Sequence, residues 1–92
     1  MADRILTADA AQTLQDDSYR DRDLLTWVVT RDEGSGEAVA RPVAAGRGAL
    51  SLILVAGTLA ELRSMMPTGL AVSERQPADP PGLVEIWMTT GA

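Results

Sequence analysis

The sequence contains no cysteine, histidine, lysine, phenylalanine or asparagine. Without cysteine the chain cannot form a disulfide, a thiolate nucleophile or a cysteine-ligated zinc site, and without histidine it lacks the commonest general base and metal ligand. Without lysine it can form neither a Schiff base nor the phosphate contact of a P-loop lysine. Any catalysis would rest on carboxylates, hydroxyls, arginine and the single tyrosine, Tyr19. We therefore predict a non-enzymatic protein with no catalytic, cofactor-binding or metal-binding residues.

Long hydrophobic runs are also missing. The longest, over residues 49–62, is interrupted by Ser51, Gly57, Thr58 and Glu61, whereas a membrane-spanning helix needs about 20 apolar residues. The first residues do not lead into the apolar segment of a signal peptide. These features predict a cytoplasmic protein that does not interact with membranes. Arginine as the only basic residue, together with 14 alanines, favours a GC-rich, bacterial source.

The length and charge of the chain narrow its expected partners. Its 92 residues are the size of one domain, 1–92, which contains a Pro-rich loop at residues 76–82. Eight arginines are scattered among 13 acidic residues, with a formal net charge of −5, so we do not expect direct binding to nucleic acid. The acidic run 16–23 includes two arginines and lacks the ligand spacing of a calcium loop. It predicts a solvated connector.

Hydrophobic periodicity predicts an α+β fold in the order α-β-β-β-α-(β)-β, with a small, mostly antiparallel sheet of four to five strands and two short helices. The helices are expected over residues 8–16, capped by Thr7, and over residues 58–66, where Thr58 and Glu61 have capping-box spacing. The strands are expected over residues 24–30, 37–43, 50–55, 70–72 and 83–89. One continuous buried helix over residues 49–66 stays open as an alternative to a strand followed by a helix.

Part of this element order resembles a known family. A β-hairpin, a third strand and a helix opened by Thr-x-x-Glu follow one another over residues 24–66. This order is similar to that of the small domain of HicB-type antitoxins. The resemblance is one of element order and includes no motif that maps residue by residue, so it implies no functional residue here.

The two tryptophans are expected in different environments. Trp27 alternates with apolar residues along its strand and is predicted to lie in the core. Trp87 alternates with Val84, Ile86 and Met88, which are predicted to point inward. Trp87 is therefore expected on the opposite face of the sheet, with its degree of exposure left open.

Tryptophan is strongly enriched in interface hot spots, so if Trp87 is exposed we predict a protein interface formed by Trp87, Leu83, Leu24 and Val28. The leading functional hypothesis is a small interaction or regulatory domain that presents an apolar sheet face and an acidic rim to another protein or to a second copy of itself. One alternative is an acidic antitoxin-like or inhibitor-like protein that covers a basic partner. A second alternative is an enzyme based on carboxylates or hydroxyls without a recognisable motif.

Overall fold

The structure is a computed structural model that describes residues 3–80 and 82–90, and it has a mixed α+β fold. Its elements are β1 (Arg4–Ile5), α1 (Ala8–Arg20), β2 (Leu25–Arg31), β3 (Ala38–Ala44), β4 (Gly48–Ala49), β5 (Leu52–Ala56), α2 (Leu59–Met65), β6 (Leu70–Glu74) and β7 (Leu83–Thr89). The mixed fold class with two helices is as predicted. Within the described residues, no helix has the length and apolar character needed to span a membrane.

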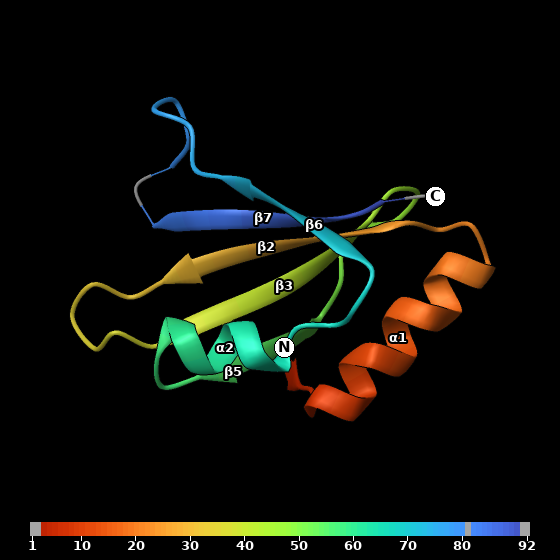
Figure 1. Cartoon of the computed structure of the whole chain (residues 1–92), viewed down its shortest axis with the longest axis horizontal. Helices are drawn as coiled ribbons and strands as arrows, with labels where there is room; N and C mark the ends of the chain where they lie inside the picture. The colour runs from red at the N-terminus through yellow and green to blue at the C-terminus, as the bar shows by residue number, and fades with distance from the viewer. Residues whose placement is uncertain (1–2, 81, 91–92) are drawn as a thin grey trace.

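In the described residues the sheet has seven strands, so the expected number of four to five was roughly right but too low. Its order is β1-β5-β3-β2-β7-β6, with β4 paired to β3 outside this path. The β1–β5 pair is parallel and the other pairs are antiparallel, as expected for a mostly antiparallel sheet. The additional strands β1 and β4 contain two residues each, too few to produce an alternating hydrophobic pattern. The strands fan out in Figure 1, and α2 lies across β3 and β5.

Threonine caps start both helices, as the sequence predicts. The side-chain oxygen of Thr7 accepts the Ala10 N–H at 3.1 Å, and that of Thr58 accepts the Glu61 N–H at 3.1 Å. Each bond satisfies a backbone donor that has no partner within the helix. Residues 49–66 therefore contain strands and a separate helix, and the alternative of one continuous helix is wrong.

Helix α1 ends four residues later than predicted, so residues 16–20 are helical and not a connector. It closes with the Schellman pattern: the Asp23 N–H donates to the Ser18 carbonyl at 2.9 Å and the Arg22 N–H donates to the Tyr19 carbonyl at 3.1 Å. Arg22 has a φ of 59°, a left-handed conformation that glycine usually supplies at this position. With arginine there, the sequence carries no glycine to mark the helix end.

The core lies between the sheet and the two helices. Trp27 is fully buried, as predicted, and it packs in a cluster with Leu25, Leu54 and Leu62. Five alanines belong to the same cluster of eleven buried apolar residues in the described part of the chain. Residues 76–80 and 82 lie in the connection between β6 and β7, whereas Pro81 of the predicted Pro-rich loop lies outside the described residues.

Candidate functional site

Strand register divides the sheet into a covered face and an open face. Trp27 lies opposite Trp87, and Val29 lies opposite Glu85, so these side chains share one face. Both helices pack there: the Gln15 side chain of α1 bonds Trp27, and Leu62 of α2 lies in the core cluster. We call this side the covered face. The residues that alternate with it point to the other side, which we call the open face.

The open face is mainly aliphatic. In the described residues no helix packs against it, and its apolar residues are absent from the core cluster. Its central side chains are partly exposed rather than buried, and they come from the four neighbouring strands β5, β3, β2 and β7. The apolar residues of the open face are Val28, Leu83, Ile86 and Met88 on β2 and β7, Val39 and Val43 on β3, and Ile53 and Val55 on β5, with Ile5 at the β1 edge.

Arg41 is the one charged residue of strands β1 to β7 that the register places on the open face. It lies opposite Val28, and its guanidinium donates to both carboxylate oxygens of Asp3 at 2.8 and 2.5 Å and to the Leu50 carbonyl at 2.8 Å. The hydrogen bonds from Arg41 lower the pKa of the Asp3 carboxyl, so the pair is fully ionised at neutral pH. The positive charge at the centre of the open face is thus compensated within the chain.

The structure separates the four residues of the predicted interface. Val28 and Leu83 lie on the open face, and Leu24 precedes β2 with 38% of its surface exposed. Trp87, however, lies on the covered face, partly buried against the core, with its indole N–H donating to Glu85 at 2.5 Å. The expected placement of Trp87 on the same face as Val28 was therefore wrong.

The prediction that Ile86 and Met88 point inward was also wrong, since both lie on the open face. The physical reason is the composition of β7, in which apolar side chains occupy both faces and periodicity cannot show which one is covered. The register also shifts between Val29 and Thr30, which leaves Val84 as an extra residue packed against the core. Only the pairing with Trp27 determines that Trp87 shares the covered face.

A hydrogen-bonded cluster on the covered face joins α2 to β7. Glu85 is buried with 5% exposure, and it accepts hydrogen bonds from the Arg63 guanidinium at 2.5 and 3.3 Å as well as from Trp87. The bonds from Arg63 lower the pKa of the Glu85 carboxyl, against the opposing effect of burial. Glu85 therefore stays ionised and connects the two elements, which is a structural role.

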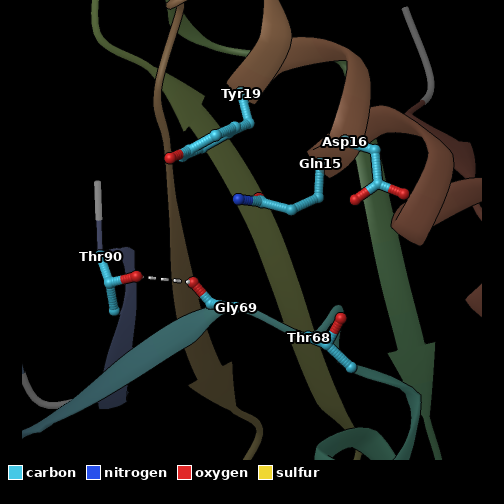
Figure 2. A pocket seen from close by; sticks show the side chains of 6 residues that line it. All are labelled: Gln15, Asp16, Tyr19, Thr68, Gly69 and Thr90. Carbon is cyan, nitrogen blue, oxygen red and sulfur yellow. Dashed lines mark hydrogen bonds between the residues drawn. The ribbon is translucent and has the colours of Figure 1, made fainter. Parts of the chain in front are cut away.

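The covered side also has a pocket of about 320 Å³ between α1 and the ends of β6 and β7. Figure 2 shows Gln15, Asp16 and Tyr19 reaching from α1 toward Thr68, Gly69 and Thr90, with the Thr90 hydroxyl donating to the Gly69 carbonyl at 3.4 Å. Within the described residues, every buried side-chain nitrogen and oxygen has a hydrogen-bond partner. No group of three acidic side chains in that part of the chain is arranged as a metal site. The pocket thus lacks an unpaired buried group that would call for a ligand.

No protein-family model matches the chain, and no curated protein or solved structure is significantly similar to it. The resemblance to the antitoxin domain remains one of element order. The feature of the described residues that points to a function is the open face.

Proposed function

We propose that the protein is a small non-enzymatic interaction or regulatory domain, and that the open face is the surface that binds another protein chain. The observation that carries the proposal is the mainly aliphatic character of a sheet face that neither helix covers. Antiparallel sheets with one solvated face normally alternate apolar and polar side chains. On β3, β5 and β7 this chain instead places Val, Ile and Met on the solvated side.

The size of the open face supports the proposal. Residues are spaced about 3.3 Å along a strand, and neighbouring strands lie about 4.8 Å apart, so the open face of β5, β3, β2 and β7 measures roughly 400 Å². Most of this area is apolar, and the rest belongs to Thr26, Thr30 and Arg41. Contiguous apolar patches of this size on monomeric proteins are frequently binding sites. Single exposed apolar residues would not support a function, but a continuous patch of this extent does.

An acidic inhibitor of a basic partner is the second candidate, and it would use the opposite side. All acidic residues inside helices and strands lie on the helix side of the sheet: Asp9, Asp16, Asp17, Glu61, Glu74 and Glu85. Two of these, Asp17 and Glu85, are paired with arginines of this chain. The two candidates differ in salt dependence, since a charge-driven complex weakens as ionic strength rises and an apolar one does not.

Photo-crosslinking in the native cell tests the proposal. A photoreactive benzoylphenylalanine replaces Val39 on the open face or, as the matched control, Val72, which lies on β6 opposite Trp87 and is 52% exposed. Both positions are valines on strands of one sheet, on opposite faces. We expect a protein adduct from position 39 and none from position 72. Equal adducts from both positions, or none from position 39, would refute the open face as the binding surface.

A further inference from the structure

We infer that the occupant of the open face is a second copy of this chain, so that two sheets pack face to face around a two-fold axis. This inference rests on the proposed function and names the partner. The resulting dimer would have four layers, with the helices outside and the two sheets in the middle. Sheets pack in this way about 10 Å apart, with strand directions within about 30° of each other.

Self-complementarity favours a second copy as the occupant. A two-fold interface buries the same patch on both partners, so each charge in the patch needs a partner either in its own chain or elsewhere in the patch of the other copy. Arg41 meets this condition because Asp3 and the Leu50 carbonyl already bind its guanidinium. Covering Arg41 therefore leaves no unpaired ion, and its aliphatic stem can pack with neighbours such as Val28.

The distribution of acidic residues also suits self-association, although each copy has a formal charge of −5. The acidic residues within helices and strands, such as Asp16 of α1 and Glu61 of α2, lie on the side away from the open face. In the four-layer arrangement the two helix layers are more than about 20 Å apart, from the sheet spacing and the helix radius. Charges at that separation are largely screened, because the Debye length is about 8 Å at physiological ionic strength. Repulsion between the acidic residues of the two helix layers is therefore weak.

The area is sufficient for a small dimer interface. Extending the open face across all six strands of the main path gives about 520 Å² per copy, or about 1,040 Å² in total. Specific interfaces need about 1,000 Å², and stable ones commonly bury about 1,200–2,000 Å². Interfaces at this low end of the size range are typical of weak, transient complexes, for which we expect a dissociation constant in the micromolar range.

The composition of the core provides a reason for two copies to associate. Five of the eleven buried apolar residues among those that the structure describes are alanine, so the single layer between sheet and helices buries little aliphatic surface for its size. A sheet-to-sheet layer would bury the valines and isoleucines of the open face as a second core. Val39 is the position for a test, because it lies on the central strand β3, opposite Thr30 of β2 and Val55 of β5.

Sedimentation equilibrium of the full chain tests the inference. Between about 1 μM and 1 mM, we expect the mass of the wild-type protein to rise from 9.7 kDa to twice that value. Val39→Asp should weaken association more than about 100-fold, because a buried carboxylate would face the partner. The matched Val72→Asp variant, with the same charge change on the covered face, should change it less than about threefold.

If Val39→Asp does not fold, as judged by circular dichroism, the near-isosteric Val39→Thr variant provides the result, with an expected weakening of about three- to tenfold. A wild-type chain that stays monomeric over the whole range overturns the inference, and so does equal weakening by substitutions at positions 39 and 72. In that case, an adduct of position 39 with a different protein in the cell would leave the proposed function standing. The absence of any adduct would overturn both.

Discussion

Gln15 is the buried amide that connects α1 to the centre of the sheet. Its side-chain oxygen accepts the indole N–H of Trp27 at 2.9 Å, and its nitrogen donates to the Thr89 hydroxyl at 2.8 Å. That hydroxyl in turn donates to the Leu25 carbonyl at 2.8 Å. Because Gln15 is 3% exposed and Trp27 is fully buried, water cannot replace the amide without a rearrangement. We predict that Gln15→Leu strongly destabilises the fold although its volume is similar.

The magnitude follows from the groups left without partners. In Gln15→Leu the indole N–H of Trp27 loses its acceptor, and a buried donor without a partner costs about 1–3 kcal/mol. The Thr89 hydroxyl loses the hydrogen bond that it accepts from Gln15, but it still donates to the Leu25 carbonyl. The loss at Thr89 therefore adds little to the cost of the substitution. We therefore expect a loss of about 2 kcal/mol in the free energy of unfolding. For a domain of 60–100 residues this corresponds to a decrease in Tm of about 8–16 °C.

A double-mutant cycle isolates the hydrogen bond between Gln15 and Trp27. Urea unfolding is followed by circular dichroism for Gln15→Leu, Trp27→Phe and the double variant, at one protein concentration because association affects apparent stability. Replacing the indole of Trp27 by the smaller phenyl ring costs packing energy in both the single and the double variant. This cost therefore cancels in the cycle. The double variant should be at least about 1 kcal/mol more stable than additivity predicts, since it leaves neither group unpaired.

Gln12→Leu on the same helix is the control, because the Gln12 amide bonds Thr68 and Asp16 at the surface. Its cost should stay below about 1 kcal/mol. The reasoning about a buried network is refuted if Gln15→Leu costs less than about 0.5 kcal/mol and the cycle is additive.

Two further predictions concern the end of α1 and the buried carboxylate. Arg22→Gly should raise the free energy of unfolding by about 0.5–1 kcal/mol. The reason is that Arg22 adopts a φ of 59°, a conformation that costs more for a residue with a side chain than for glycine. Unchanged or lower stability in urea unfolding would contradict this prediction. The lowered pKa of Glu85 means that its ionisation stabilises the fold above the ordinary value of 4.5, and that this contribution is lost as the pH falls through the lower folded value. Glu85→Gln should therefore destabilise the protein at pH 7 and make its stability less dependent on pH below about 4.5. Parallel pH profiles for the wild-type and variant proteins would show that Glu85 has no such role.

The sequence was sufficient to predict the elements with strong local signals. The run Leu83–Thr89 has the predicted bounds, and the threonine caps at Thr7 and Thr58 start their helices as expected. The end of α1 was missed because Arg22 occupies a position where glycine is the usual signal. The pairing of β1 with β5 joins residues about fifty positions apart in the sequence and involves only two residues of each strand, so no local pattern indicates it.

The open face was predicted only in part. The alternation in β2 correctly predicts that Trp27 and Val28 lie on opposite faces. Trp27 is buried in the core, and Val28 lies on the open face. In β7 the extra residue Val84 changes the phase of the alternation, so Leu83 lies on the open face and Trp87 on the covered face. Where both faces of a strand are apolar, only the packing of the helices decides which face is covered.

A single introduced cysteine measures the central claim most directly, because the chain has no cysteine of its own. The alkylation rate of the thiol is measured against protein concentration for Val39→Cys on the open face and for Val72→Cys on the covered face. If two open faces pack together, the rate at position 39 falls at least about tenfold once the concentration exceeds about fifty times the dissociation constant, and the rate at position 72 stays constant. A rate at position 39 that does not change with protein concentration would contradict the account.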